Sequence, residues 1–207
     1  MSWWMATVYD RLIAQSEAAC LRAWRRDLLA GVTGRVLEVG AGTGLNIPHY
    51  TANVTRLVLS EPDPHMRAKL QSRLAAALPA VVELSEATLD CLPMPDQTFD
   101  AVVSTLVLCS VRDLAQALGE IRRVLAPGGR LVFLEHVGAE DRPDRLKWQR
   151  RVEPLWKALT GNCHLTRRTE SAIKRAGFDI VQIERESIRK AMSLTRPSIR
   201  GIAVRST

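Results

Sequence analysis

The chain has 207 residues, of which 46% are hydrophobic and 25% are charged, and these are the proportions of one ordinary globular domain. No apolar run approaches the roughly 18 residues of a membrane span, and no signal-peptide core is visible, so we expect a cytoplasmic protein. The formal net charge of +7 allows a nucleic acid or an anionic membrane surface as a partner, but the basic residues stand in scattered pairs that are more typical of solvated helix faces.

The cysteines and histidines show no spacing typical of a metal site or a redox motif. The four cysteines are far apart and form no C-x-x-C pair, and the four histidines are equally scattered. The sequence therefore predicts reduced thiols and no bound metal.

Residues 3–30 are predicted to be helical and to precede the first strand. The apolar residues of this segment can be placed on one broad helix face: Leu12, Ile13, Cys20, Leu21, Trp24, Leu28 and Leu29. The segment either lies over a cofactor site, where the phenol of Tyr9 could reach a ligand, or packs plainly against the sheet. We expect one domain over residues 1–207, with 1–30 as a helical lid and 31–207 as the core.

The next stretch, residues 35–46, combines a short apolar strand with a glycine-rich turn. The predicted strand covers residues 35–39, and Gly40, Gly42 and Gly44 follow at alternating positions. Glycines allow backbone angles that are closed to other residues and let the main chain approach a ligand. The spacing is neither the dinucleotide G-x-G-x-x-G nor a P-loop. It indicates a nucleotide-type cofactor loop, after which a helix usually begins and offers its free N–H groups.

An acidic residue follows the second predicted strand, residues 56–60. Glu61 stands at the tip of that strand, where a carboxylate can accept hydrogen bonds from both hydroxyls of a ribose. Asp63 is better placed to interact with the N-terminus of the helix predicted over residues 65–78. At the tip of a third strand, residues 81–84, Glu86 could accept from an adenine amine.

The remainder of the chain continues the alternation of strands and helices. We expect a Pro-broken crossing at 89–96, strands at 101–105, 130–135, 178–184 and 201–205, and helices at 112–125, 142–159 and 166–176, the last with Thr166 as N-cap. This order predicts an α/β fold with a Rossmann-like, seven-stranded, mostly parallel sheet and helices on both faces.

Four motifs together resemble one enzyme family. They are E-V-G-A-G-T-G at 38–44, the acidic Glu61, L-P-M-P-D-x-x-F-D at 92–100 and L-x-P-G-G-R at 125–130. This combination is similar to the type 11, ubiquinone-biosynthesis-like branch of the class I S-adenosylmethionine (SAM) dependent methyltransferases. The segments 105–111, 135–137, 148–149, 153–156 and 163–167 look like those of the narrower alkyl thiol methyltransferase family. Members of that family carry an apolar N-terminal membrane segment, and none is visible in this sequence.

The resemblance implies SAM as cofactor. The expected cofactor site comprises Tyr9, Glu38, Gly40, Ala41, Gly42, Gly44, Asn46, Glu61, Pro62, Met66, Glu86, Ala87, Thr105 and Leu106. The expected acceptor pocket comprises Cys109, His136 and Trp148, which fall on segments that can converge at the carboxyl edge of the sheet. His136 is the candidate catalytic base and otherwise fixes the loop after the fifth strand. Cys109 is expected to line the pocket and not to act as a nucleophile.

The expected reaction is methyl transfer from SAM to a small hydrophobic acceptor. A thiol is favoured, and a phenol or a lipid headgroup is the alternative acceptor. Two other functions are a nucleic-acid methyltransferase and a SAM-binding scaffold without catalysis. The Asn/Asp-Pro-Pro-aromatic loop of many base-amine methyltransferases is not matched by residues 104–107, which makes a nucleic-acid partner unlikely. The basic residues leave peripheral contact with an anionic membrane surface open as an alternative to solvated helix faces.

Overall fold

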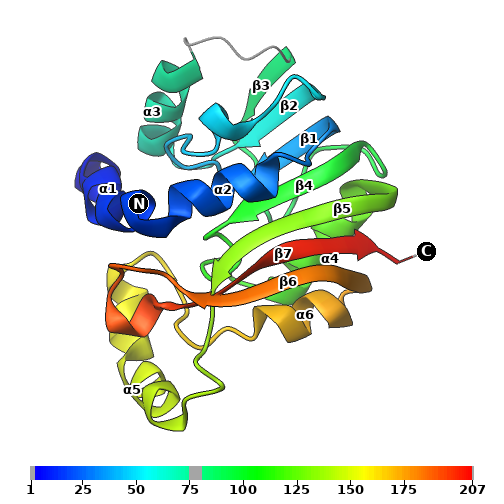
Figure 1. The fold of residues 1–207 in the computed structure, drawn as a ribbon. Coiled ribbons are helices and arrows are strands. Elements are labelled where there is room, and N and C mark those ends of the chain that lie inside the picture. The colour runs from blue at the N-terminus through cyan, green and yellow to red at the C-terminus, as the bar shows by residue number, and fades with distance from the viewer. Residues whose placement is uncertain (1–2, 75–80, 207) are drawn as a thin grey trace.

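One seven-stranded sheet forms the centre of the protein (Figure 1). The computed structural model describes residues 3–74 and 81–206, with side chains from residue 10 onward. The strand order is β3-β2-β1-β4-β5-β7-β6. The strands are β1 Gly34–Val39, β2 Val54–Ser60, β3 Val81–Ser85, β4 Phe99–Thr105, β5 Leu125–His136, β6 Phe178–Ser187 and β7 Pro197–Arg205. The seven strands confirm the predicted fold class.

The first five strands are parallel, and β7 alone runs antiparallel, between β5 and β6. Val39 at the end of β1 pairs with Ser60 of β2 and with Ser104 of β4, so these strands end level with one another. Their carboxyl ends therefore bring the segments after β1, β2, β4 and β5 to a single edge. Ligands of open α/β sheets bind at that edge.

Helices cover both faces of the sheet. They are α1 Trp3–Ser16, α2 Arg22–Leu29, α3 Pro64–Leu74, α4 Leu114–Val124, α5 Pro143–Leu159 and α6 Thr169–Arg175. Helices α2 and α3 share one apolar cluster with β1 and β2, while α4 and α6 share the cluster on the opposite face. In Figure 1, α1 and α5 lie beside the edge where the parallel strands end, and α1 is next to α3.

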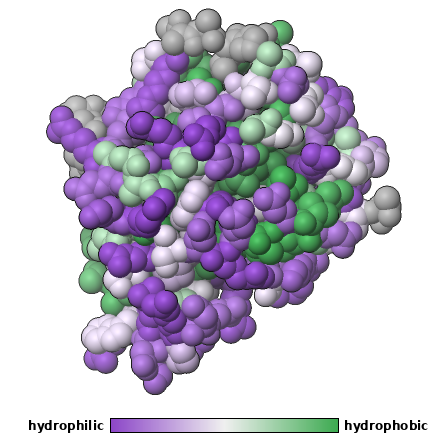
Figure 2. All heavy atoms as spheres, in the orientation of Figure 1, coloured by the Kyte–Doolittle hydropathy of each residue, from purple (hydrophilic) through white to green (hydrophobic). Residues whose placement is uncertain are grey.

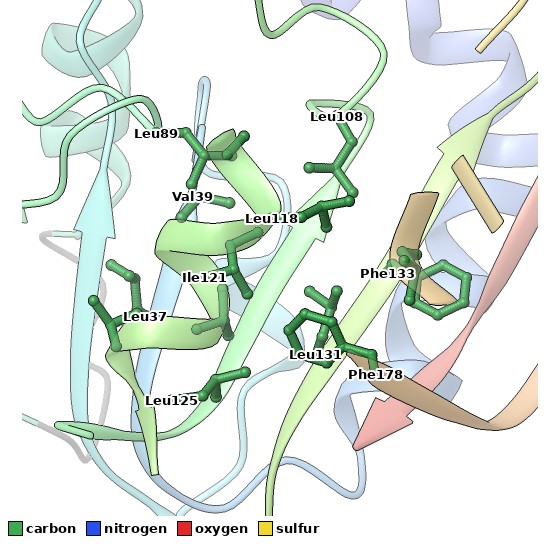
Figure 3. Packing of buried hydrophobic residues seen from close by; sticks show 14 of the residues in the cluster. Leu37, Val39, Leu89, Leu108, Leu118, Ile121, Leu125, Leu131, Phe133 and Phe178 are labelled. Atoms are coloured by element: carbon green, nitrogen blue, oxygen red, sulfur yellow. The ribbon is translucent and has the colours of Figure 1, made fainter. Parts of the chain in front are cut away.

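The core follows from the alternation of side chains along each strand. In β1, Val36 points into the α2 side of the sheet, whereas Leu37 and Val39 point into the α4 side. Figure 3 shows Leu118 and Ile121 of α4 packed over the strands. Because both faces of β1 are covered beyond its first two residues, the polar side chain of Glu38 is buried too, whereas Arg35 at the start of the strand is exposed.

The N-terminal helical segment differs from the prediction in the placement of its apolar face. A π-helix, Glu17–Leu21, joins α1 to α2 and inserts a wider turn. The wider turn rotates the face of α1 relative to that of α2. The later apolar residues such as Trp24 are buried as predicted, but Leu12 is 67% exposed. The prediction was wrong for Leu12 because it assumed an unbroken α-helical period.

The short helix that follows the glycine loop is a 3₁₀-helix, Ile47–His49. Two other local predictions differ from the structure. Thr166 does not cap α6, because its hydroxyl donates to Glu153 Oε2 at 2.6 Å and the helix begins at Thr169. The fifth strand begins at Leu125, which pairs with Phe99, and not at Arg130.

Surface hydrophobicity is uneven. Figure 2 shows apolar side chains gathered over β5 and β7 beside α2, with polar residues around them. Among residues 3–74 and 81–206, no helix has the length and hydropathy that a membrane crossing requires.

Candidate functional site

The glycine loop after β1 adopts the conformation that its residues allow. Gly40, Gly42 and Gly44 all have positive φ, at 58°, 59° and 86°. A Cβ at Gly40 would lie 2.6 Å from Val107 Cγ2, so the loop packs directly under the tip of β4. A Cβ at Gly42 would meet only the Gly40 carbonyl oxygen at 3.9 Å, so the backbone there faces open space. The loop is thus packed at its base and accessible at Gly42.

Glu61 is held against this loop. Its Oε2 accepts from the Gly42 N–H at 2.8 Å, and its Oε1 accepts from the Asp63 N–H at 2.9 Å. The residue is 6% exposed, and burial raises the pKa of its carboxyl group. A carboxylate offers about four lone-pair sites, so each oxygen retains acceptor capacity for a ligand hydroxyl. Asp63 caps α3 as predicted, because its Oδ1 accepts from the Met66 N–H.

A buried polar network supports the loop from below. Glu38 accepts from the Tyr50 hydroxyl at 2.6 Å and from Asn46 Nδ2 at 3.0 Å. Arg25 of α2 donates to Asn46 Oδ1 at 2.8 Å and to Thr105 Oγ1 at 2.9 Å. Burial raises the pKa of Glu38 to about 7. The network therefore joins β1, the glycine loop, α2 and the end of β4 in one rigid unit.

Sequence reasoning missed three members of this network: Tyr50, Arg25 and Glu17, the ion-pair partner of Arg25. Arg25 Nε lies 3.1 Å from Glu17 Oε1, and both residues are buried. One signal was available. Arg25 falls between Trp24 and Leu28 on the apolar face of its helix, where a charge is costly unless it is paired.

The helix α1 is tied to the glycine loop. Asp10 accepts from Thr43 Oγ1 at 2.7 Å and from Arg73 of α3 at 2.6 Å. Arg73 also donates to the Thr43 carbonyl oxygen at 2.7 Å. These bonds connect α1, the loop and α3. The side chain of Tyr9, a predicted cofactor residue, lies outside the described part of the structure.

The predicted adenine side is arranged around Arg67. This residue donates to the Glu61 carbonyl at 2.9 Å and to Glu86 Oε1 at 2.6 Å, while the Glu86 side chain is mostly exposed. The Ala87 carbonyl accepts from Ser60 Oγ at 2.6 Å. Of the remaining predicted residues, Met66 and Ala41 are buried and Pro62 is exposed.

The tip of β4 is fixed by Glu135, a second group that sequence reasoning did not assign to the site. Its buried Oε1 accepts from Ser104 Oγ at 2.8 Å and from the N–H groups of Val107 and Leu108, both at 3.1 Å. Leu106 between them has a φ of 60°, which is costly for a bulky residue. A strained residue beside the glycine loop is the kind of feature that a ligand site retains.

The structure brings Cys109 and His136 together and adds Cys163. His136 Nε2 lies 2.8 Å from Cys163 Sγ, which lies 4.0 Å from Cys109 Sγ. Hydrogen bonding with Cys109 and burial raise the pKa of Cys163, so this thiol is neutral near pH 7. Trp148 does not join the group, because it lies on α5 with 62% of its surface exposed.

The comparisons with known proteins identify the family of the chain. A family model described as a methyltransferase domain matches residues 37–133, from β1 into β5. Thiol S-methyltransferase TMT1A of Homo sapiens is 36% identical over 180 residues, which cover 85% of this chain and 73% of that protein. Thiol S-methyltransferase TMT1B of Homo sapiens is 37% identical over 184 residues, covering 86% and 74%. The chain belongs to the family of these SAM-dependent methyltransferases.

The fold of this methyltransferase is also that of a solved structure. The SAM-dependent methyltransferase of Thermotoga maritima, described as a possible histamine N-methyltransferase, superposes with a TM-score of 0.68 over 99% of this chain and 97% of that one, at 18% identity. Family membership identifies the protein as an enzyme with SAM as its cofactor and a small molecule as its methyl acceptor. Family membership therefore decides against the two alternative functions, a scaffold without catalysis and a nucleic-acid methyltransferase.

Proposed function

We propose that this methyltransferase transfers the methyl group of SAM to the sulfur of a small hydrophobic thiol. The observation that carries the proposal is the hydrogen bond between His136 Nε2 and the Cys163 thiol. A histidine whose inward nitrogen is engaged by a protein thiol is not free to deprotonate an acceptor. Thiols have a pKa near ~8.5 and supply some thiolate unaided at neutral pH, whereas alcohols do not. The relation to two thiol S-methyltransferases supports the same acceptor.

In this proposal, different residues of the site bind different parts of the cofactor. We assign Glu61 to the ribose hydroxyls, and the open backbone at Gly42 to the amino-acid end of the cofactor. Glu86 and Ala87 are assigned to the adenine side, with Pro62 and Met66 beside it. Bound SAM supplies an electrophilic methyl group on a sulfonium centre.

The remaining task of the protein is orientation. An in-line displacement needs the acceptor sulfur held opposite the leaving group, and correct orientation contributes about 7–11 kcal/mol in favourable cases. The Glu135 bonds that fix the tip of β4 hold Leu106 and Cys109 where an acceptor would enter. In this proposal residues 1–30 close the cofactor side, because Asp10 bridges α1 and the glycine loop.

A turnover screen across thiols, phenols and amines tests the proposal. We expect methylation of thiols, with a pH profile that follows the pKa of each thiol. His136→Ala should lower kcat by less than about a hundredfold, because a general base typically contributes about 10²–10⁴-fold. Cys91→Ser, which alters an exposed thiol outside this group, serves as the control. Turnover of phenols alone, or a thousandfold loss in a folded His136→Ala variant that still binds SAM, would contradict the thiol acceptor.

We further propose that α5 contacts an anionic membrane surface, from which a hydrophobic acceptor would be supplied. Three apolar side chains of α5 are more than 60% exposed: Trp148, Leu155 and Leu159. Leu155 and Leu159 follow Trp148 by seven and eleven residues, which places all three on one helix face. Lys147 and Arg151 are their exposed cationic neighbours on the same helix. An amphipathic helix of this kind binds at the interface of anionic bilayers. Co-sedimentation with anionic vesicles, and not with neutral ones, should be lost in Leu155→Glu.

A further inference from the structure

We propose that Cys109, His136 and Cys163 form a binding site for a thiophilic divalent cation of the Zn²⁺ class. One ligand atom from each residue lies within 4.8 Å of the other two. Two thiolates and an imidazole are a ligand set that zinc prefers. The spacing of the three residues in the sequence concealed this group, because 27 residues separate His136 from Cys163 and 54 separate the two cysteines.

The distances suit a tetrahedral ion. With bonds of about 2.3 Å to sulfur and 2.1 Å to nitrogen, two sulfur ligands stand ~3.8 Å apart and a sulfur and a nitrogen ~3.6 Å apart. The two Sγ atoms are 4.0 Å apart. The Nε2 to Sγ distance of 2.8 Å is shorter because a hydrogen bond now joins these atoms. Replacing the hydrogen-bonded proton by an ion requires a shift of less than about 1 Å, within the reach of a cysteine χ1 adjustment.

The segment that carries Cys163 is held in place by hydrogen bonds to backbone carbonyl groups. The His164 N–H donates to the Cys109 carbonyl at 2.8 Å, and Asn162 Nδ2 donates to the Ser110 carbonyl at 2.9 Å. Asn162 has a φ of 74°, which asparagine tolerates better than most residues. These bonds fix the two cysteines relative to each other before any ion arrives.

The surroundings of the group include a fixed cation and a histidine nitrogen without a protein partner. The Arg167 guanidinium donates to the Val111 carbonyl, two residues after Cys109. His136 Nδ1 is buried and has no protein partner. The protein therefore leaves Nδ1 of the ring without a hydrogen bond, while Nε2 faces the sulfur atoms.

Three protein ligands leave the fourth position of a tetrahedral ion open, which is the arrangement of catalytic zinc sites. A thiol is a soft ligand that suits this position. This last step rests on the proposed function, because the ligand at this position would be the acceptor thiol. Binding of the ion itself does not depend on that function.

Cobalt(II) titration of the reduced, chelator-treated full-length protein tests the site. We expect one equivalent to bind with the thiolate charge-transfer and visible bands of tetrahedral cobalt, and Zn²⁺ to displace it. Cys163→Ser should weaken cobalt binding at least a hundredfold, and Cys109→Ser should do the same. Cys91→Ser, an exposed cysteine elsewhere, should bind cobalt like the wild type. Addition of a small thiol to the cobalt-loaded protein should shift the spectrum.

Separate readouts distinguish failure of this proposal from failure of the proposed function. SAM affinity by calorimetry should be unchanged in Cys163→Ser, which confirms that the variant folds. Absence of the cobalt bands, or bands that persist in Cys163→Ser, would overturn the metal site while leaving thiol methylation untouched. A Cys109–Cys163 disulfide under mild oxidation, in a reduced protein that binds no metal, would show a redox pair instead. A wild type that binds cobalt but methylates only phenols would retain the site and refute the thiol acceptor.

Discussion

The two sides of the ligand edge differ in how completely their polar groups are paired. The proposed cofactor side comprises β1, β2, the glycine loop 40–44 and α2, and its buried groups such as Arg25, Glu38 and Glu61 all have protein partners. The proposed acceptor side comprises the tips of β4 and β5 and residues 148–167. Among the side chains that the structure describes, it holds four of the buried polar atoms without a partner: Glu135 Oε2, His136 Nδ1, Trp156 Nε1 and Arg167 Nε.

This difference in pairing suits different roles for the two proposed sides: the first supports the glycine loop, and the second takes part in the reaction. A buried unpaired polar group costs about 1–3 kcal/mol, so a protein does not keep several in one place without a reason. The saturated cofactor side is a rigid frame that presents one loop. On the acceptor side, the four atoms named above have no hydrogen-bond partner within the described protein. Mutations on the cofactor side should therefore change stability and cofactor affinity, and those on the acceptor side should change turnover or ion binding.

The largest effect is expected from Arg25→Met. This change leaves Glu17 as a buried, uncompensated charge and removes the donor to Asn46 and Thr105, so stability should fall by about 3–5 kcal/mol. Arg26→Met, which alters the exposed neighbouring arginine, should change stability by no more than about 0.5 kcal/mol. Urea unfolding of the two variants measures the difference. Equal losses would show that the network does not stiffen the cofactor side.

The next largest effect concerns the pH dependence of stability. The pKa of Glu38 is raised from 4.5 to about 7 by burial, so its contribution is full below pH 4.5 and is lost as the pH rises through 7. Relative to Glu38→Gln, the wild type should lose stability on the order of 2–3 kcal/mol between pH 4 and 8. Urea unfolding at several pH values checks this. Parallel profiles for the two proteins would mean that Glu38 does not titrate in this range.

A smaller effect is expected for SAM affinity in Glu61→Ala. Removing the carboxylate deletes the proposed ribose acceptor and the partner of the Gly42 N–H, so the affinity should fall at least tenfold, or ~1.4 kcal/mol. Calorimetry with Glu83→Ala, an exposed glutamate of β3, provides the charge-matched control. Unchanged affinity in Glu61→Ala would remove this residue from the cofactor site.

The smallest effect should come from Trp148→Ala. Because this tryptophan is exposed on α5, we expect the acceptor KM to rise only about two- to threefold while SAM affinity stays constant, since surface changes are usually within about 0.5 kcal/mol. Steady-state kinetics with a thiol acceptor separates the two quantities. A change in both, or in neither, would place the acceptor pocket away from α5.

The sequence by itself determined the sheet, the glycine loop and Glu61. These features depend on residues close together in the chain: an apolar strand predicts its own burial, and alternating glycines predict an accessible turn. The fold class, the family and the cap at Asp63 were predictable for the same reason. The sequence could not reveal the break in the N-terminal helix, because a π-helical turn depends on packing against the sheet and leaves the apolar spacing nearly unchanged.

Only the tertiary structure decided which distant side chains meet. Arg25 reaches Thr105 across 80 positions, and Cys109 reaches Cys163 across 54, because parallel strands end at one edge and bring their following loops together. A periodic pattern describes which face a residue takes on its own element, but not which loop lies opposite. The cofactor loop is local and was visible in the sequence, whereas the buried arginine network and the cysteine–histidine group depend on the packing of separate elements.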